Sequence, residues 1–576
     1  MSTVAQMIVT ALGDLGVRSV WGVVGDALNP LTEAIRQDGR VEWIGVRHEE
    51  VGAFAVSAQS QLSGTLGVCM GTVGPGSIHL LNGLYDAKKS RTPVLAVCGQ
   101  VPVAELGNDM FQEVDNDLLF RDVAVFARTV TSPSQLPQLL EQAVNSAVSH
   151  HGVSVLTLPG DLGDVELPDG TPAPRFAPPA VPSTPAPSAI RGVADVLAEA
   201  GPVTLLVGMG AREARGEVLE LADRLAAPMV LTLKGKEGLE RDNPFQLGQT
   251  GLIGNPAAAQ ALDDCEVLFL VGTDFPYRDW IPTGKTVIQL DSRPEHIGRR
   301  AGVDHALVGM ARETLQALLP LIGTRRKRDR SHLDRSRAAY GRWLEGQARL
   351  ADPRHDRRLL GRLRSKADNP DGRIRPEALA EAVDRYAADD AIFTVDTGMS
   401  TAWASRLIHL RGTRRLVGSF NLGSMANALP HALGAQALDR RRQVIALCGD
   451  GGLMMLLGDL RTAVTHDLPL TVVVFDNGQL GMVKLEQEQG GLPEFGTALD
   501  NPDLAAVASA MGLASRVVAS AREVDEAVRW ALAERQPSLL DVRTNPTEVA
   551  LPPKAKPGQA WGFAIAKMKE SISSAE

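Results

Sequence analysis

The sequence is poor in aromatic residues and cysteines, and it has no long apolar run. Phe, Trp and Tyr make up 4% of the 576 residues, and the four cysteines include no Cys-x-x-Cys pair. Their spacing therefore excludes the common zinc-binding patterns. No apolar run approaches the ~18 residues that a membrane-spanning helix needs. The N-terminus has no basic segment followed by an apolar stretch, so we expect no signal peptide.

Clustered positive charge is also lacking. Lys and Arg number 59 against 68 Asp and Glu, which gives a formal net charge of −9. A nucleic-acid partner is not expected, because binding one needs basic residues gathered on one face. The short basic run at residues 325–330 is interpreted as a solvated segment. Three of the cysteines fall in apolar, strand-like runs, which favours buried free thiols in a reducing cytoplasm.

Glycine and proline, in contrast, are plentiful at 56 and 35 residues. Short apolar runs alternate with amphipathic helical stretches, beginning with a helix over residues 4–15 that Thr3 could cap. This alternation predicts an α/β protein of three consecutive doubly wound parallel-sheet domains. The predicted strands are residues 19–24, 65–70, 93–97, 153–158, 203–207, 229–233, 267–271, 286–290, 391–395, 444–448, 470–475 and 539–542.

Composition also predicts where the domains meet. A Pro-rich stretch at 166–187 should be a stiff, extended linker, and a charged helical stretch at 325–372 should form a second connection. The predicted domains are therefore residues 1–165, 188–324 and 373–548, followed by a tail at 549–576.

The strongest local signal is CGDGGLMM at 448–455 followed by FDNGQLGM at 475–482. Gly451 and Gly452 would let the backbone approach a phosphate closely after a strand. Asp450 and Asn477 stand at the ends of consecutive strands and could share a ligand, with the Gln479 carbonyl nearby. Such oxygen donors suit Mg²⁺ shared with a diphosphate. A Gly-rich turn with a surface Asp is the alternative for GDG alone.

This arrangement resembles the cofactor motif of thiamine-diphosphate enzymes. In that family a glutamate of the first domain activates the cofactor, and Glu49 in RHEE matches it, although a Glu in such a segment taken alone is more often a solvated helix residue. The segment NLGSMANALP resembles the loop that binds the pyrimidine ring. The resemblance implies further cofactor contacts at Gly25, Gly423, Ser424 and Met425.

The predicted middle domain carries Gly-rich turns at strand ends, where open α/β sheets bind nucleotides, and an acidic strand end at Asp291 suited to a ribose hydroxyl. Its segments resemble the FAD-binding domain of bacterial pyruvate oxidases, most closely the quinone-linked pyruvate dehydrogenases, over essentially the whole chain. The resemblance implies FAD contacts from Lys234, Thr250, Gly251, Leu252, Ile253, Thr273, Asp274, Phe275, Pro276, Tyr277, Arg278 and Asp291.

The family's chemistry is oxidative decarboxylation of a 2-oxo acid, here pyruvate, to acetate and CO₂, with electrons passing through FAD to a quinone. Phe111 and Gln112 match substrate-pocket positions. Met482 stands where an enterobacterial member carries an aromatic residue that moves on activation. The alternative is a carboligating enzyme like acetolactate synthase with a structural FAD, which CGQVP, FQEVD and LGMVKLEQ resemble. Against it, Lys484 and its neighbours replace that family's tryptophan, and GTDFPYR favours the oxidase.

The resemblance further implies a homotetramer in which thiamine lies between two subunits. The expected location is the cytoplasm. Trp561, Ile565 and Met568 could form an apolar stripe in the tail that touches the inner face of the membrane, or a docked helix. The expected electron acceptor is a quinone or another oxidant.

Overall fold

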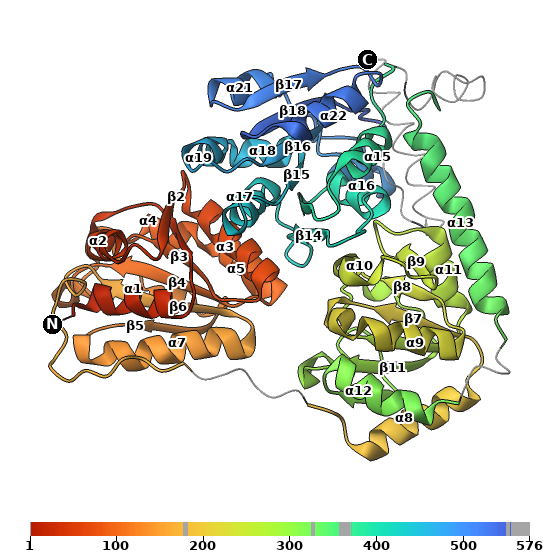
Figure 1. The fold of residues 1–576 in the computed structure, drawn as a ribbon, viewed down its shortest axis with the longest axis horizontal. Helices are drawn as coiled ribbons and strands as arrows, with labels where there is room; N and C mark the ends of the chain where they lie inside the picture. Colours follow the sequence, from red (N-terminus) through yellow and green to blue (C-terminus); the bar gives the residue numbers. More distant parts are fainter. Residues whose placement is uncertain are drawn as a thin grey trace.

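A computed structural model describes residues 2–176, 183–323, 329–355, 369, 371–548 and 553. Three six-stranded parallel sheets follow one another along the chain and form three lobes (Figure 1). This confirms the predicted fold class. The first sheet has the order β2-β1-β3-β4-β6-β5, and the third has the equivalent order β14-β13-β15-β16-β18-β17. The middle sheet differs, with the order β12-β11-β10-β7-β8-β9.

The strands are short and mostly buried, as parallel strands covered by helices on both faces must be. In the first sheet they are β1 Ser19–Gly22, β2 Glu42–Gly45, β3 Gly67–Gly71, β4 Val94–Gln100, β5 Ala124–Thr129 and β6 Val153–Pro159. In the middle sheet they are β7 Val203–Val207, β8 Met229–Leu231, β9 Gln246–Gln249, β10 Val267–Val271, β11 Thr286–Asp291 and β12 His305–Val308. In the third they are β13 Ile392–Val395, β14 Arg415–Gly418, β15 Val444–Gly449, β16 Thr471–Asp476, β17 Ala514–Val518 and β18 Ser538–Arg543.

Helices connect the strands of each sheet. The first lobe has α1 Val4–Asp14, α2 Asn29–Asp38, α3 Glu49–Ser63, α4 Pro75–His79, α5 Leu81–Ser90, α6 Asn116–Leu119 and α7 Leu136–His150. The middle lobe has α8 Pro187–Glu199, α9 Arg215–Leu225, α10 Leu233–Leu239, α11 Pro256–Asp264 and α12 Ala311–Leu318, followed by the long α13 Ser331–Ala351. The third has α15 Pro376–Tyr386, α16 Met399–Leu407, α17 Ala428–Leu438, α18 Asp450–Met455, α19 Leu460–Thr465, α20 Gly481–Gln489, α21 Leu504–Ala510 and α22 Val524–Ala533.

Helix α1 begins as its sequence predicts. Thr3 and Gln6 form a reciprocal capping box, in which the Thr3 side chain accepts from the Gln6 N–H and the Gln6 side chain accepts from the Thr3 N–H. All four cysteines are buried and free, also as expected. No helix in the described part of the chain is long and apolar enough to cross a membrane. The tail residues Trp561, Ile565 and Met568 lie outside the described residues.

Small residues let the first and third lobes pack closely. Helix α3 is buried along most of its length and lies against both α5 and α17. A Cβ on Gly434 of α17 would lie 2.2 Å from the Ala55 carbonyl oxygen of α3, so only glycine permits this approach. The buried side chains of Asp86 in α5 and His431 in α17 also pair, at 3.2 Å. One hydrophobic core therefore runs through both lobes.

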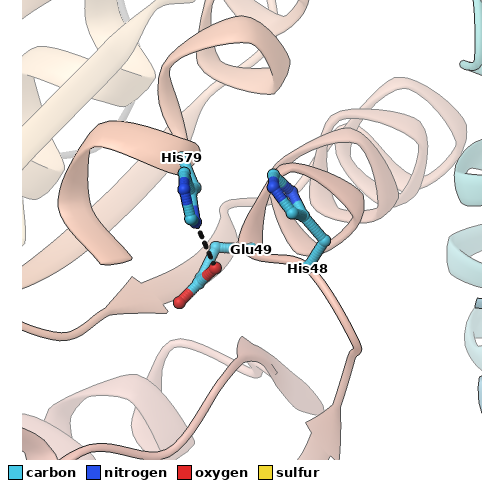
Figure 2. Close-up of side chains that lie close together, drawn as sticks. All are labelled: His48, Glu49 and His79. Atoms are coloured by element: carbon cyan, nitrogen blue, oxygen red, sulfur yellow. Dashed lines mark hydrogen bonds and ion pairs between the residues drawn. The ribbon is translucent and has the colours of Figure 1, made fainter. Parts of the chain in front are cut away.

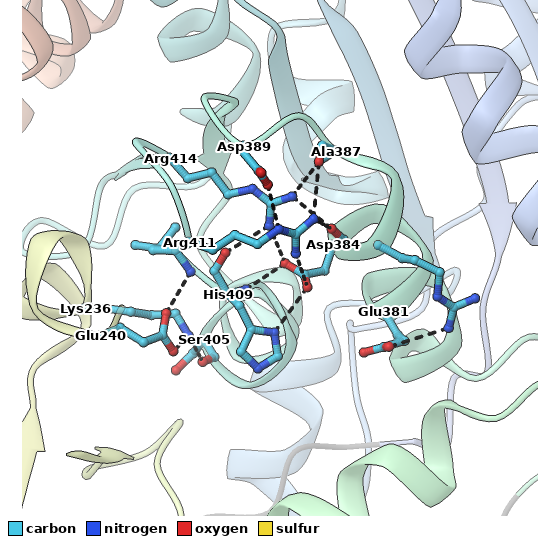
Figure 3. Close-up of polar contacts among 12 residues, drawn as sticks. Lys236, Glu240, Glu381, Asp384, Ala387, Asp389, Ser405, His409, Arg411 and Arg414 are labelled. Carbon is cyan, nitrogen blue, oxygen red and sulfur yellow. Dashed lines mark hydrogen bonds and ion pairs between the residues drawn. The ribbon is translucent and has the colours of Figure 1, made fainter. Parts of the chain in front are cut away.

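A polar network holds the middle lobe to the third (Figure 3). The buried Lys236 ammonium of α10 pairs with Glu240 at 2.9 Å and donates to the Ser405 carbonyl at 2.8 Å. Glu240 in turn accepts from the Leu410 N–H at 2.8 Å. In the third lobe, the Asp384 carboxylate accepts a hydrogen bond from the fully buried Arg414 guanidinium at 2.7 Å. The contacts of Lys236 and Glu240 cross from the end of α10 to α16 and the loop after it, and they fix the two lobes beside one another.

Candidate active site between the lobes

A first cavity lies at the carboxyl ends of two neighbouring strands of the third sheet. Strands β15 and β16 pair in parallel, with Gly449 beside Phe475, so the residues that follow each strand meet at one edge. Asp450 and Asn477 both line this cavity, as do Gly451, Gly452 and Gln479. The sequence predicted this neighbourhood from spacing alone, and the structure brings these residues together.

Asp450 is the electrostatic centre of this cavity. Its Oδ2 accepts from the Gly478 N–H at 3.0 Å and from Asn501 Nδ2 at 2.6 Å, and Asn501 also reaches Asp476 at 3.3 Å. Burial raises the pKa of the Asp450 carboxyl to about 6, and the neighbouring Asp476 carboxylate adds to the shift. A cation beside Asp450 would relieve this crowding of negative charge. The oxygen donors of Asp450, Asn477 and Gln479 therefore fit a hard cation such as Mg²⁺.

Two glycines of this cavity have different surroundings. Gly452 is packed tightly against the protein interior, whereas Gly449 faces open space, so a ligand can approach the backbone there. A Cβ on Gly452 would lie 1.6 Å from Asp396 Oδ2, whereas a Cβ on Gly449 would meet no atom within 4 Å. Asp396 is buried, and its Oδ1 accepts from the Thr397 N–H and from both the N–H and the side-chain amide of Asn427. Burial raises the pKa of Asp396 to about 7. Sequence reasoning missed Asp396, although its place directly after β13 could have indicated it.

A larger cavity of about 320 Å³ opens beside the first, where the middle lobe faces the other two. Thr397, Gly398 and Met482 line both cavities, so the two share a wall. Most residues predicted to contact FAD line the larger cavity, namely Lys234, Thr250, Leu252, Ile253, Thr273, Asp274, Phe275, Pro276, Tyr277 and Asp291.

Two predicted FAD residues are placed differently. Gly251 and Arg278 do not line this cavity. Gly251 lies behind the wall, where a Cβ would be 3.2 Å from both Phe275 and Tyr277, and Arg278 is exposed. Sequence reasoning missed lining residues from outside the middle lobe, including Arg91, Thr401, Ser419 and Phe420.

The walls of the larger cavity carry charge that is only partly balanced. The Lys234 side chain is half-buried, and its partial removal from water lowers the pKa of its ammonium group to about 8. Arg91 pairs with Asp274 at 3.0 Å, and Arg299 and Arg300 bind the same carboxylate at 3.3 and 2.9 Å. The charge of the Asp274 carboxylate is therefore already balanced by arginines of this chain. The positive charge in excess of this one carboxylate suits an anionic ligand.

Two further features of the larger cavity fit a dinucleotide. Asp291 closes β11, and its Oδ1 accepts from the Arg293 N–H at 3.0 Å and contacts His296 Nδ1 at 3.1 Å. Among the described residues, Gln249 Nε2 and Thr250 Oγ1 have no hydrogen-bond partner, although both residues line the cavity. Buried polar groups of this kind usually find a partner, so a polar ligand is expected against this wall.

Glu49 lines neither cavity. It is the first residue of α3 and is buried, and its Oε2 is 3.0 Å from Nδ1 of His79 (Figure 2). A Cβ on Gly76 would lie 3.2 Å from Glu49 Oε1, so glycine keeps the turn after β3 close to this carboxylate. Gly25 packs on Thr72 at the same edge of the first sheet.

The remaining predicted residues divide between the cavities and the surface. Gly423 lines the larger cavity, Met425 lines the smaller one, and Ser424 accepts from Asn82 of the first lobe at 3.0 Å. Gln112 packs against Gly74, whereas the Phe111 side chain is 86% exposed. A single chain therefore does not gather Glu49, Phe111 and Gln112 with the cavity that contains Asp450.

Comparison with known proteins assigns the three lobes. Residues 2–119, 190–318 and 396–542 match the N-terminal thiamine pyrophosphate binding domain, the central domain and the C-terminal thiamine pyrophosphate binding domain of thiamine pyrophosphate enzymes. A putative thiamine pyrophosphate-containing protein, YdaP of Bacillus subtilis, is 37% identical over 571 residues, which is 98% of this chain and 96% of the relative.

Two relatives with more specific names are similar over nearly the same span. The pyruvate oxidase of Lactiplantibacillus plantarum is 30% identical over 93% of this chain and 87% of its own length. The large subunit of acetolactate synthase isozyme 2 from Escherichia coli is 32% identical over 95% of this chain and 96% of its own length. With matching domains in the family's order and relatives of this coverage, the chain belongs to the thiamine pyrophosphate enzymes.

Proposed function

We propose that this enzyme oxidatively decarboxylates a 2-oxo acid, pyruvate in the first instance. Pyruvate and water give acetate and CO₂, and the two electrons and two protons released pass through FAD to a quinone. The observation that carries this proposal is the shared wall of Thr397, Gly398 and Met482 between the two cavities. A donor in the smaller cavity and an acceptor in the larger one would then be separated by little more than one side chain.

The smaller cavity is proposed to hold the diphosphate of thiamine through Mg²⁺. Asp450, Asn477 and the Gln479 carbonyl would be the ligands from the protein, and Gly449 leaves space for the phosphates. Met425, whose Cε would be 3.5 Å from a Cβ on Gly451, would support the middle of the cofactor. When bound, thiamine diphosphate supplies the electron sink for decarboxylation.

The larger cavity is proposed to hold FAD. Lys234 and Arg91 would meet its negative charge, and Asp291 would accept a hydrogen bond from its ribose. The cavity reaches the wall with the thiamine site, which is where a redox-active ring would need to lie. Bound there, FAD supplies a two-electron acceptor.

Glu49 is proposed to act in the site of a second copy of the chain. It lines neither cavity of its own subunit, so a partner's first lobe would have to bring the equivalent carboxylate to the thiamine. Glu49, Gln112 and Phe111 would then reach the reacting groups together. The exposure of the Phe111 side chain, at 86%, supports such an arrangement, which we expect in a homotetramer.

The test is an anaerobic flavin spectrum of the protein with Mg²⁺ and thiamine diphosphate, before and after pyruvate is added. Rapid loss of the oxidised-flavin absorbance, with acetate formed, is the expected result. A flavin that stays oxidised while acetolactate accumulates would instead support carboligation with a structural FAD. That alternative is kept because an acetolactate synthase subunit is 32% identical to this chain.

A further inference from the structure

His48, Glu49 and His79 form a cluster of side chains that could bind a metal ion (Figure 2). None of the three lines the diphosphate cavity. His48 caps α3, Glu49 is its first residue, and His79 ends α4. One ligand atom from each residue lies within 4.8 Å of the other two. Glu49 Oε2 and His79 Nδ1 are 3.0 Å apart, close to the about 3.3 Å between two ligands of a tetrahedral ion.

The third ligand needs only a small movement. The His48 ring stacks on the His79 ring with centroids 4.4 Å apart and an angle of 25° between the planes. His48 Nδ1 accepts from the Glu50 N–H at 3.3 Å, a long capping hydrogen bond. Giving up such a cap costs little beside the free energy of binding a transition metal to three ligands.

Solvent reaches this cluster, and no fixed cation competes for it. The side chains of His48 and His79 are 38% and 42% exposed, whereas that of Glu49 is 9% exposed. Within the described part of the chain, Glu49 forms its one ion pair with His79 and none with Lys or Arg. The Glu49 carboxylate thus contacts His79, on which the His48 ring stacks, and the exposure of both imidazoles leaves open positions for water.

We propose that the cluster of His48, Glu49 and His79 binds a late first-row divalent metal, with Zn²⁺ and Cu²⁺ as the preferred ions, in the protein that lacks thiamine diphosphate. Two imidazoles and one carboxylate suit these ions better than they suit Mg²⁺, which prefers oxygen ligands. The ion would hold Glu49 away from the cofactor. The bound metal would thereby inhibit the enzyme reversibly, and it would compete with thiamine diphosphate rather than with the 2-oxo acid. This inhibition rests on the proposed function, whereas the metal binding does not.

The test measures Zn²⁺ binding directly, by competition with a chromophoric chelator, in protein stripped of thiamine diphosphate. Excess Mg²⁺ is present to occupy the site at Asp450. One Zn²⁺ per chain is expected, with affinity reduced by more than about tenfold in Glu49→Gln and in His79→Asn. His150→Asn, at an exposed histidine in the same lobe, is the matched control and should bind as the parent does.

Thermal melting of each variant without metal shows whether it is folded. His48→Asn is a second variant that, like His79→Asn, removes a proposed metal ligand while leaving Glu49 in place. Zn²⁺ affinity that is unchanged in Glu49→Gln, His79→Asn and His48→Asn would overturn the site. A second measurement separates this proposal from the function above. If Zn²⁺ binds as expected but leaves the apparent Kd of thiamine diphosphate unchanged, the metal site stands and its inhibitory role is overturned.

Discussion

Gly452 and Asp396 lie so close together that no side chain fits between them. A Cβ on Gly452 would be 1.6 Å from Asp396 Oδ2. The same carboxylate holds Thr397 and Asn427 through its other oxygen, so it joins the wall between the two cavities to the loop that carries Met425. One buried aspartate thus links three segments of the proposed cofactor site.

Gly452→Ala is expected to destabilise the protein by about 3 kcal/mol, because overpacking a filled interior forces backbone and side chains to shift. Thermal or denaturant unfolding without cofactor measures this. Gly449→Ala is the matched control, since its Cβ meets no atom within 4 Å. The control should unfold as the parent does but bind thiamine diphosphate more weakly. Equal stability of both variants would contradict the close packing described here.

Met482→Ala is expected to slow flavin reduction by the 2-oxo acid roughly ten- to a hundredfold, because Met482 fills the wall shared by the two cavities and its loss would disturb the alignment of donor and acceptor. Stopped-flow absorbance under anaerobic conditions measures the rate. Met482→Leu, of similar volume, should retain most of it. A normal reduction rate in Met482→Ala would remove this residue from the proposed electron path.

Glu49→Gln is expected to lower decarboxylation by about 10²–10⁴-fold, the usual contribution of one acid–base group. The direct measurement is proton exchange at C2 of bound thiamine, which should slow in parallel. Mixing Glu49→Gln chains with Asp450→Ala chains provides the control for sharing between subunits. Recovery of activity in the mixture is expected if each site takes its glutamate from a partner, and a mixture without activity would argue that each chain works alone.

His296→Leu is expected to weaken FAD binding about tenfold. His296 Nδ1 contacts Asp291 Oδ1 at 3.1 Å, and losing a hydrogen bond to a buried carboxylate costs about 1.5 kcal/mol or more. Release of flavin fluorescence on dilution gives the dissociation constant. His296→Gln can restore the donor and should bind more tightly than His296→Leu. Identical affinity in both variants would mean that Asp291 does not need this support.

Glu377→Gln is expected to stabilise the protein increasingly as the pH rises. Burial raises the pKa of Glu377 to about 8, with Glu548 adding to the shift, and among the described residues its Oε2 has no hydrogen-bond partner. Between about pH 5 and pH 8 the unfolded chain has lost this proton while the folded chain keeps it, so the parent's stability falls as the pH rises. Melting temperatures across that range test this. A constant difference between the parent and the variant would show that Glu377 ionises normally.

The inner strands of each sheet were predictable, and the edge strands were not. The predicted runs at 203–207 and 267–271 coincide with β7 and β10, which are buried throughout. Both edge strands of every sheet were missed. Edge strands such as β2, β5 and β17 alternate irregularly between buried and exposed positions, so they lack the continuous apolar run that marks a buried strand.

Some residues of the candidate site were likewise predictable from the sequence, and others were not. Asp450 and Asn477 were predictable as neighbours because they follow consecutive strands of one sheet, a relation that sequence order alone can suggest. Arg91 was not, since it comes from the first lobe and its place in the larger cavity depends on packing between lobes that the sequence pattern does not specify. Asp396 was missed although it directly follows β13, a place that could have indicated it.

The first and third sheets share one strand order, and a sheet of a different order separates them along the chain. Two lobes of the same topology in one polypeptide are prone to exchange strands while they fold, a common route to misassembly in multidomain proteins. During synthesis the first lobe can finish folding while the middle lobe is still being made. The third lobe is therefore synthesised after the first lobe, which has the same strand order, has folded. Joining the first lobe directly to the third should therefore lower the yield of native protein on refolding.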